Sequence, residues 1–277
     1  MTPAPHPDHL PFLRAIVESP DDDLPRLVYA DFLEESGDAE MIARAHFIRA
    51  QIAIETLPPR SQEAKETNAL IERLVDMFHE EFYLELPLWL SNEGNLVYRR
   101  GFLDTVSLKL PQLLSDGIDL FHNFPIEGLI LNSYLGMPTN NGWMAELPYL
   151  SRIHTLGFNA YYTPLTHERI DEESTPFFRE LMSTPVLSQL RTLSFHANSI
   201  GDAWLVRFVS LLPRAAFANT LRELDFTDCL LIGDAGANTL ATARSLDQLT
   251  KLTLKNVQIN DTSRNMLRRR FGDRVKF

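Results

Sequence analysis

The stretch TLRELDFTDCLLIGDAGANTLA, residues 220–241, decides the fold that this chain is expected to adopt. Its first ten residues place leucine or phenylalanine at positions 221, 224 and 226 and a cysteine at position 229. Two further stretches follow the same L-x-x-L-x-L-x-x-N/C pattern, LSQLRTLSFHANSIGD at 187–202 and LDQLTKLTLKNVQIND at 246–261. Such self-similarity indicates a repeat architecture in which each repeat stacks on its neighbours.

The repeat extends upstream when the paired apolar positions of each motif are aligned. The aligned pairs are Leu129/Leu131, Leu156/Phe158, Leu193/Phe195, Leu224/Phe226 and Leu252/Leu254. Successive pairs are 27, 37, 31 and 28 residues apart, and the longer intervals indicate an extra loop between repeats. A less regular pair, Val106 and Leu108, lies 23 residues before the first of these.

Each pair predicts a short strand whose two apolar side chains point into the interior, because alternate side chains of a strand share one face. The residue at the N/C position is expected to satisfy backbone groups where the chain turns away from the strand. Asn198 and Cys229 hold that position. Cys229, the single cysteine, is therefore interpreted as a buried structural residue rather than a nucleophile, which would need a partner base.

These motifs resemble leucine-rich repeats, and IGDAGANTLA, residues 232–241, is similar to the helical return of the ribonuclease-inhibitor type. The resemblance implies an α/β leucine-rich repeat solenoid, with a curved parallel sheet and helices outside it. Residues 88–108 resemble the R-G-F-x-x-x-V-x-L entry strands of such proteins, and residues 265–277 resemble their terminal helix and last strand. The C-terminal cap is placed at residues 255–277, with residues 268–270 (Arg-Arg-Arg) as the solvated part of its helix rather than a nucleic-acid site.

The first third of the chain is expected to be helical, because its apolar residues recur three or four positions apart. Residues 10–17 form the first predicted helix, and the second starts at Leu24 and ends at Gly37. A third predicted helix covers residues 38–56, and a fourth starts near Ser61. Such short amphipathic helices must pack together to bury their apolar faces.

Three consecutive aspartates, Asp21, Asp22 and Asp23, precede the second predicted helix. An aspartate at this place accepts hydrogen bonds from the unpaired N–H groups of the first turn, and helix capping is the interpretation we favour. A calcium loop would need alternating oxygen ligands, which adjacent aspartates do not provide. Asp31, Glu34 and Glu35, near neighbours on a helix, are interpreted as a solvated helix face rather than as carboxylates paired for acid–base catalysis.

The segment FLRAIVESPDDDLPRLVYADFLEESGDAEMIARAHFIRAQIA, residues 12–53, resembles the bacterial repeat-companion domain, a small helical module found beside leucine-rich repeats. The shared pattern is F-L-x-A-I, then D-D-x-P-R-L-V-Y-A-D-W-L-E-E-x-G-D, then R-A-x-F-I-R-x-Q. Phe32 replaces the usual tryptophan and His46 replaces an acid. The resemblance implies a neighbouring repeat array and no particular activity. Residues 1–90 are therefore assigned to an acidic helical domain and residues 91–277 to the repeat domain.

The acidity of the chain is concentrated at its N-terminal end. The net charge is −11, and residues 1–90 hold 18 acids against 7 bases, which alone gives −11. This balance repels phosphate backbones and anionic lipid, so neither nucleic acid nor a membrane is an expected partner, despite a basic patch at Arg264 and residues 268–270. One cysteine, no signal-peptide pattern and no apolar run of about 18 residues predict a cytoplasmic protein.

An open sheet face exposes alternate side chains that the core does not need, and these form the predicted binding surface. They mix polar, small and charged groups, which suits a protein or peptide partner better than a polyanion. The predicted contact residues are Ser107, Lys109, Asn132, Asn159, Ser194, His196, Asp225, Thr227, Thr253 and Lys255. The leading hypothesis is a noncatalytic scaffold that binds its partner there, without metal or cofactor.

Two other functions stay open at this stage. The acidic helical domain would, in one of them, dock the chain as a structural subunit into a larger assembly. A hydrolase that uses His196 with Asp225 or Asp228 is the other, because side chains on neighbouring strands lie close together. The sequence contains no elbow serine, phosphate loop, H-E-x-x-H motif or ligand-spaced set of histidines, so catalysis is not expected. The oligomeric state is left open.

Overall fold

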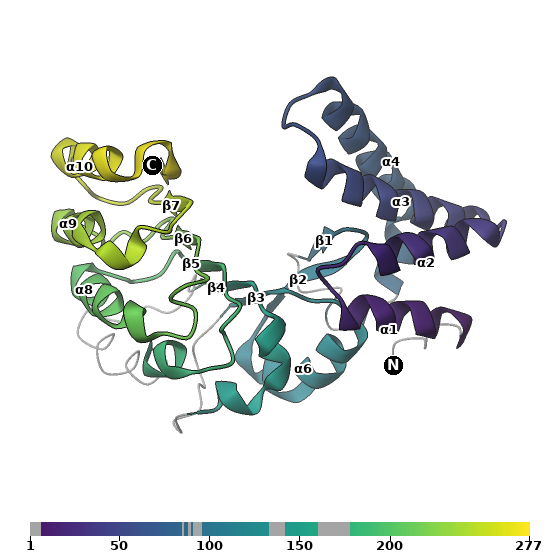
Figure 1. Cartoon of the computed structure of the whole chain (residues 1–277), viewed down its shortest axis with the longest axis horizontal. Helices are drawn as coiled ribbons and strands as arrows, with labels where there is room; N and C mark the ends of the chain where they lie inside the picture. The colour runs from purple at the N-terminus through teal and green to yellow at the C-terminus, as the bar shows by residue number, and fades with distance from the viewer. Residues whose placement is uncertain (1–6, 85, 88–89, 91–95, 133–141, 160–177) are drawn as a thin grey trace. The chain divides into compact units, whose positions relative to one another are not determined.

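The computed structural model describes residues 7–84, 86–87, 90, 96–132, 142–159 and 178–277 of the 277-residue chain. It is an α/β protein with an eight-stranded sheet in the order of the sequence (Figure 1). The strands are β1 (Val97–Arg99), β2 (Phe102–Leu108), β3 (Gly128–Leu131), β4 (Thr155–Asn159), β5 (Thr192–His196), β6 (Glu223–Asp225), β7 (Lys251–Thr253) and β8 (Val275–Lys276). The pairings from β3 to β8 are all parallel, which confirms the α/β class.

The chain divides into two compact units. The first, here called the helical unit, comprises Met1–Ser107 and Asp119–Ile126, and the second, the sheet unit, comprises Leu108–Ile118 and Glu127–Phe277. The β1–β2 hairpin thus falls with the N-terminal helices, beyond the boundary that the sequence placed at residue 90.

Four helices dominate the helical unit, as the spacing of its apolar residues predicts. They are α1 (Leu10–Glu18), α2 (Leu24–Glu35), α3 (Ala39–Thr56) and α4 (Gln62–Leu84), preceded by a 3-10 turn at Pro7–His9. Their largest core cluster consists of Ile16, Tyr29, Ala30, Leu33, Ala45, Ile48 and Phe102, from α1, α2, α3 and the start of β2. Burial of this apolar surface, at roughly 25 cal/mol per Å², is the main force that holds the helices together.

The aspartates before α2 act at the start of that helix. The carboxylate of Asp22 accepts a hydrogen bond from the backbone N–H of Leu24 at 2.9 Å, and Pro25 occupies the first turn. Asp23 makes no side-chain cap bond, and its carboxylate lies 3.5 Å from the guanidinium of Arg100. The capping interpretation is therefore confirmed through Asp22, whereas Asp23 reaches the β1–β2 turn instead.

The starts of α3 and α4 are capped by side-chain oxygens in the same way. Asp38 accepts hydrogen bonds from the backbone N–H groups of Glu40 and Met41, at 2.9 and 3.1 Å. The hydroxyl of Ser61 accepts one from the N–H of Ala64 at 3.0 Å. Each such cap contributes about 1 kcal/mol, so residues 38 and 61 define where these helices begin.

The carboxylates on α2 do more than face the solvent. Asp31 and Glu34 lie 2.5 and 2.8 Å from guanidinium nitrogens of Arg49 on α3. Burial acts to lower the pKa of Arg49, but its hydrogen bonds to the two carboxylates outweigh this effect and the pKa is raised. Both carboxylates are exposed, which confirms the interpretation as a solvated helix face, and they pair with Arg49 in addition. They join α2 to α3, although exposed pairs of this kind stabilise by only about 1 kcal/mol or less.

The turn between β1 and β2 is packed directly against α3. Arg100 and Gly101 both adopt left-handed backbone conformations, with φ of 51° and 85°. The N–H of Gly101 donates to the Oε1 atom of Gln51 at 2.7 Å. A Cβ atom at Gly101 would lie 2.3 Å from Cγ1 of Ile48, closer than any real contact. This position therefore requires glycine for two independent reasons, its backbone conformation and the space available.

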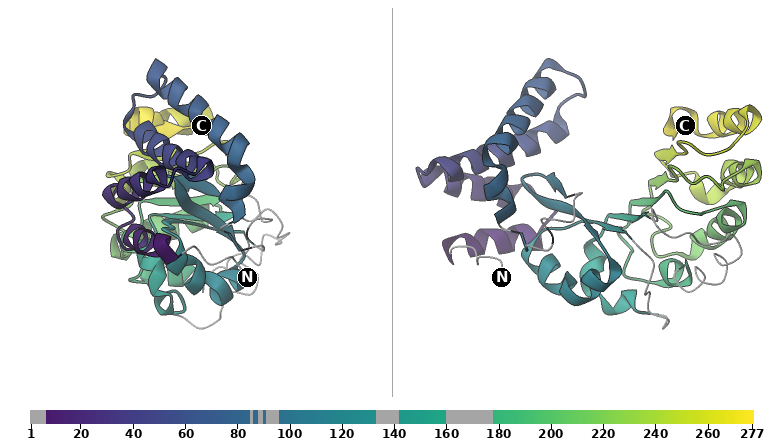
Figure 2. Two further views of the ribbon diagram at one scale, coloured as in Figure 1. Left: turned by 90° about the vertical axis from the view of Figure 1, so that its right-hand side faces the viewer. Right: turned by 180° about the vertical axis from the view of Figure 1, so that it is seen from behind.

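The sheet unit is a series of parallel strands with helices on one face. Figures 1 and 2 show α8 (Asp202–Leu211), α9 (Asp234–Thr242) and α10 (Asp261–Phe271) side by side along the same side of β5, β6 and β7. The apolar pairs that the repeat pattern assigns to the interior are all buried. Their first members are register neighbours from β3 to β7, namely Leu129, Leu156, Leu193, Leu224 and Leu252. The sequence alignment of the strands is thereby confirmed.

The chain leaves successive strands through the same backbone conformation. Ala197, Asp228 and Asn256 have φ of 52°, 61° and 59°, and they recur at intervals of 31 and 28 residues. A left-handed residue reverses the chain direction, and aspartate and asparagine adopt this conformation more readily than other non-glycine residues. The corner after each of these strands is therefore a structural repeat as well as a sequence repeat.

The residue after each corner connects neighbouring strands, as the N/C position predicts. The Nδ2 atom of Asn198 donates to the carbonyl of Phe158 at 2.6 Å and to that of His196 at 2.9 Å. The thiol of Cys229 donates to the carbonyl of Phe195 at 2.8 Å. Phe158 and Phe195 are register neighbours, so Asn198 and Cys229 do the same task one strand apart. The structural interpretation of the single cysteine is confirmed.

A second set of hydrogen bonds joins the helix starts. Asp202, at the start of α8, accepts from the N–H of Gly233, and Asp234, at the start of α9, accepts from the N–H of Asn260, at 2.7 and 2.9 Å. Gly236 lets α9 approach α8, because a Cβ atom there would lie 2.4 Å from Oδ1 of Asp202. Gly236 therefore serves the packing of α9 against the preceding helix.

We expect Asp234→Asn to destabilise the C-terminal end of the sheet unit in a pH-dependent way. Hydrogen bonds from Asn260 and Ser263 hold the pKa of Asp234 below its usual range. A depressed carboxyl pKa contributes stability above the unfolded value of about 3.9, and this contribution is lost as pH falls through the folded-state pKa. Denaturation at several pH values should therefore show a difference from wild type at neutral pH that shrinks in acid. Asp273→Asn, at an exposed carboxylate of the same unit, is the control for the loss of one negative charge.

The last repeat ends in a helix and a short strand, as the terminal motif implies. After α10, a 3-10 turn at Gly272–Arg274 leads to β8, which pairs with β7. Arg268 and Arg269 are exposed, but Arg270 donates to the carbonyl of Leu240 at 3.1 Å and to the carboxylate of Asp247 at 2.8 Å. The interpretation of all three arginines as solvated is therefore wrong for Arg270, which closes the end of α9.

Parts of two predictions lie outside the described residues. These are the beginning of the entry segment, within residues 88–95, and the loop expected in the longest repeat interval, within residues 160–177. None of the described helices is both long and apolar enough to cross a membrane.

Candidate binding surface of the parallel sheet

The central column of the predicted surface is a continuous row across the sheet unit. Ile130, Gly157, Ser194, Asp225 and Thr253 are register neighbours on β3 to β7. They alternate with the buried leucines, so their side chains point to the face opposite the helices. The row continues on β8 with Lys276, which is paired with Thr253. The sequence missed this lysine because β8 lacks the L-x-L pattern.

A second row follows at the carboxyl ends of the strands. Asn159 and His196 are register neighbours on β4 and β5. The N–H of Ala197 donates to the carbonyl of Thr227, and the N–H of Asp228 donates to that of Lys255, both at 2.9 Å. These bonds place residues 196, 227 and 255 in successive positions along one edge. The predicted neighbours are therefore brought together.

A third row, which the sequence reasoning did not include, lies at the opposite ends of the strands. Thr155, Thr192, Glu223 and Lys251 are register neighbours on β4 to β7. Lys251 forms an ion pair with Glu223 at 3.1 Å; the lysine is exposed and the glutamate is partly exposed. The same two-residue alternation, continued one step toward the N-terminus of each strand, would have identified these positions.

Burial divides the predicted contact residues. Eight of the ten are at least partly exposed, including Lys109, Asn132 and Lys255. The other two are buried: Ser107, which belongs to the helical unit, is 1% exposed, and Thr253 is 5% exposed. A direct contact requires accessible atoms, which Ser107 and Thr253 do not offer here, and their assignment as contact residues stays a prediction.

The most polar part of the surface is a network on β5, β6 and β7. The Nε2 atom of His196 lies 3.5 Å from Oδ2 of Asp228, and Oδ1 of Asp228 accepts a hydrogen bond from the side chain of Asn256 at 2.7 Å. Asp225 accepts hydrogen bonds from the N–H and the hydroxyl of Thr227, at 2.8 and 2.6 Å. Of the two acids suggested as partners of His196, Asp228 is the one placed beside it.

The single thiol of the chain does not add a nucleophile to this network. Cys229 is fully buried, and burial raises its pKa to about 12. The reactive form of cysteine is the thiolate, which such a pKa keeps negligible at neutral pH. The polar network therefore offers hydrogen-bonding groups and charges for recognition, with His196, Asp225 and Asp228 as its partly exposed ionisable members.

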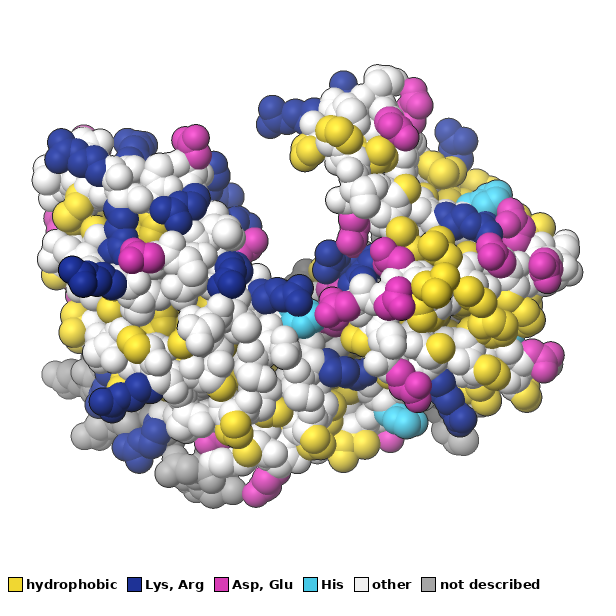
Figure 3. Space-filling model, in the orientation of Figure 1, with side chains coloured by type: hydrophobic (Ala, Val, Ile, Leu, Met, Phe, Trp, Pro, Cys, Tyr) yellow, Lys and Arg dark blue, Asp and Glu magenta, His cyan; other side chains and the backbone are white. Residues whose placement is uncertain are grey.

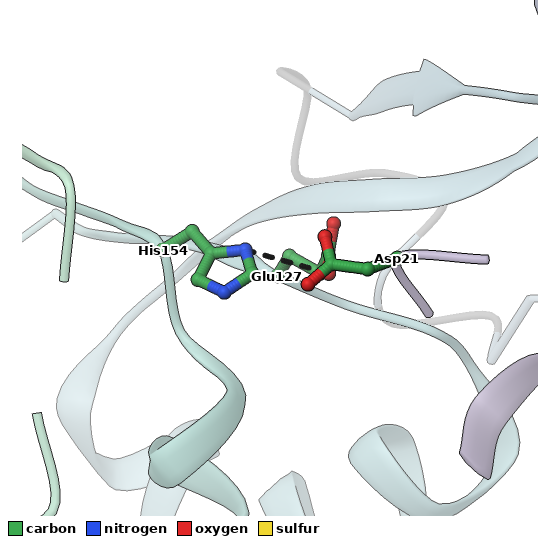
Figure 4. Close-up of side chains that lie close together, drawn as sticks. All are labelled: Asp21, Glu127 and His154. Atoms are coloured by element: carbon green, nitrogen blue, oxygen red, sulfur yellow. Dashed lines mark ion pairs between the residues drawn. The ribbon is translucent and has the colours of Figure 1, made fainter. Parts of the chain in front are cut away.

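A separate charged cluster stands before the amino ends of β3 and β4. The Nδ1 atom of His154 lies 3.4 Å from Oε1 of buried Glu127 (Figure 4). Burial lowers the pKa of neighbouring Arg152, and the charge of Glu127 acts in the opposite direction. The cluster joins two neighbouring strand starts, since the N–H of His154 also donates to the carbonyl of Glu127. Asp21, drawn in the same figure, belongs to the helical unit.

Together, the fold and this surface define an α/β protein whose parallel sheet carries rows of partly exposed polar side chains on the face opposite its helices. Comparison with known proteins adds no relative to this description: no family model matches the chain, and neither a curated protein nor a solved structure does.

Proposed function

We propose that the chain is a noncatalytic binding protein of the leucine-rich repeat class. On this proposal the sheet unit is a solenoid that holds a protein or peptide on its open face, and the N-terminal helices are a repeat-companion domain. The observation that carries the proposal is the set of register-aligned rows on the face opposite the helices, which include partly exposed polar residues such as Thr192, Ser194 and His196. Side chains that stability does not require are available for recognition.

The composition of the rows supports a protein partner. Ser194, Asn159 and Thr227 offer neutral hydrogen-bonding groups, and the acids Glu223 and Asp225 on β6 are followed by Lys251 on β7 and Lys276 on β8. A surface of mixed sign lacks the positive stripe that binds a phosphate backbone. We therefore propose a cytoplasmic scaffold without a nucleic-acid or membrane partner.

A matched pair of arginine substitutions tests the use of the open face. Ser194→Arg adds a bulky cation to the middle of the central row, whereas Ala203→Arg adds the same side chain to an exposed position of α8. We expect Ser194→Arg to weaken a partner captured from native lysate, and then purified, by about tenfold or more in Kd, because a well-packed centre carries most of the binding energy. Equal affinity of the two variants would contradict this proposal.

A hydrolase remains a second candidate because His196 and Asp228 lie 3.5 Å apart at the carboxyl edge of the sheet. A histidine oriented by an acid is the arrangement of a general base. An activity screen with model esters, amides and phosphoesters, followed by His196→Ala, tests this candidate. Turnover that this substitution abolishes would replace the scaffold proposal with an enzymatic one.

A structural role through the acidic helical unit is the third candidate. Its support is the charge imbalance, since residues 1–90 alone account for a net charge of −11. A complementary basic surface is the partner that such an imbalance favours.

A further inference from the structure

The C-terminal end of this acidic chain is strongly basic. Residues 251–277 contain eight lysines and arginines against two aspartates, which gives a charge of +6 in a chain whose total is −11. Figure 3 shows lysine and arginine side chains gathered over α10 and the neighbouring end of the sheet. The repeat pattern does not account for this concentration of charge, and the binding rows contribute only Lys251, Lys255 and Lys276 to it.

Some of these cations are used by the fold itself. Arg270 and Arg274 donate to backbone carbonyls, among them those of Leu240 and Leu249. Lys251 is paired with Glu223. Four other cations are exposed, and we call this set the basic end: Lys255, Arg268, Arg269 and Lys276.

The last strand brings the basic end together. Lys276 on β8 is paired with Thr253, and Lys255 follows two residues later on the same side of the chain. The guanidinium groups of Arg264 and Arg268 each lie 5.1 Å from the ring centre of Phe277, the residue next to Lys276. Positive charges therefore surround the final strand of the sheet on both sides.

We propose that the basic end binds the acidic helical unit of a second copy of this chain. The argument is charge complementarity, because residues 1–90 carry a net charge of −11. Their exposed carboxylates include Glu35, Glu63, Glu72 and Asp76. A nucleic acid could also contact these four cations, but the acidic remainder of the protein would repel its phosphates. A second copy of the chain offers an acidic surface that the basic end attracts.

This contact joins two different surfaces of the chain, so it does not stop at a dimer. A contact between unlike patches leaves one patch of each kind free on every pair, and it continues into a ring or an open chain of copies. We therefore expect species larger than a dimer as concentration rises. We also expect the association to weaken with salt, because the screening length falls from about 30 Å at 0.01 M to about 3 Å at 1 M.

Sedimentation velocity of the full chain at low and high ionic strength tests the proposal. We expect association at about 0.01 M salt and monomers at about 1 M. The double variant Arg268→Glu/Arg269→Glu should raise the dissociation constant by at least about tenfold. Arg207→Glu/Arg214→Glu, at two exposed positions on the α8 side of the sheet unit, changes the net charge equally and should leave association unchanged.

Lys255→Glu/Lys276→Glu provides a second variant in case the first one disturbs α10, with folding checked by circular dichroism. A chain that is monomeric at every salt concentration would overturn the proposal. Association that persists in both basic-end variants, or falls equally in the control variant, would overturn it as well. Binding of a fluorescent oligonucleotide by monomers, lost in the same variants, would assign the surface to nucleic acid instead. Arg268 and Arg269 lie on α10, outside the proposed binding rows, so the result with Arg268→Glu/Arg269→Glu is independent of the proposed partner site.

Discussion

Replacement of Gly101 by alanine is expected to lower the free energy of unfolding of the helical unit by about 4 kcal/mol. A left-handed residue with a Cβ atom costs about 1–2 kcal/mol relative to glycine, and overpacking adds about 1–3 kcal/mol. The clash cannot be relieved by a side-chain rotation alone, because the new Cβ would also lie 2.8 Å from the backbone Cα of Ile48. The β1–β2 turn would have to move away from α3, which would also break the bond to Gln51.

Gly37→Ala is the matched control for this experiment. Gly37 has φ of 72°, but nothing lies within 4 Å of a Cβ atom placed there. Only the conformational cost remains, and we expect a loss of about 1 kcal/mol. Chemical denaturation of the two variants followed by helical circular dichroism separates the two effects. An equal loss of unfolding free energy in the two variants would mean that α3 shifts to accommodate the new Cβ atom. The close packing of Gly101 would then contribute little to stability.

Asn198→Ala is expected to destabilise the sheet unit by about 3 kcal/mol. The side chain is 4% exposed and donates to two carbonyls, those of Phe158 and His196. An acceptor left without a partner in the interior costs about 1–3 kcal/mol, and the cavity adds to this cost. The loss should be concentrated in β4 and β5, where these carbonyls lie, and hydrogen exchange of the strand amides measures it locally.

Asn198→Cys provides the comparison that the chain itself suggests. Cys229 holds the corresponding corner one strand later and donates to the carbonyl of Phe195. A cysteine at residue 198 would keep one of the two bonds and fill part of the space, so we expect roughly half of the loss seen with alanine. If Asn198→Ala and Asn198→Cys destabilise the sheet unit equally, the side-chain hydrogen bond at residue 198 does not contribute to its stability.

The periodic features of the chain could be predicted from its sequence. Helix starts at Asp38 and Ser61, the buried pairs of the strands and the role of Cys229 all depend on local spacing or on a pattern that recurs. The central row of the sheet face was predicted for the same reason. In a parallel array with constant strand register, knowledge of one inward pair determines the direction of every neighbouring side chain.

Charged side chains could not be placed in this way. Arg49 reaches Asp31 and Glu34 across two helices, and Arg270 reaches Asp247 across 23 residues of chain. A long flexible side chain selects among all groups within its reach, and only the packed structure brings those groups near. Thr253 was likewise predicted to be exposed from its alternation, but it is 5% exposed in the structure.

The sequence by itself determined where the N-terminal helices and the strands of the repeats lie and which of their residues face the core, because periodicity records which side of each element is apolar. It also determined the opposite charges of the two ends of the chain. Only the tertiary structure decided which polar residues remain accessible and which charges are neutralised. Those properties depend on contacts between residues far apart in the chain, as in the placement of His196 beside Asp228 and of Lys276 beside Thr253.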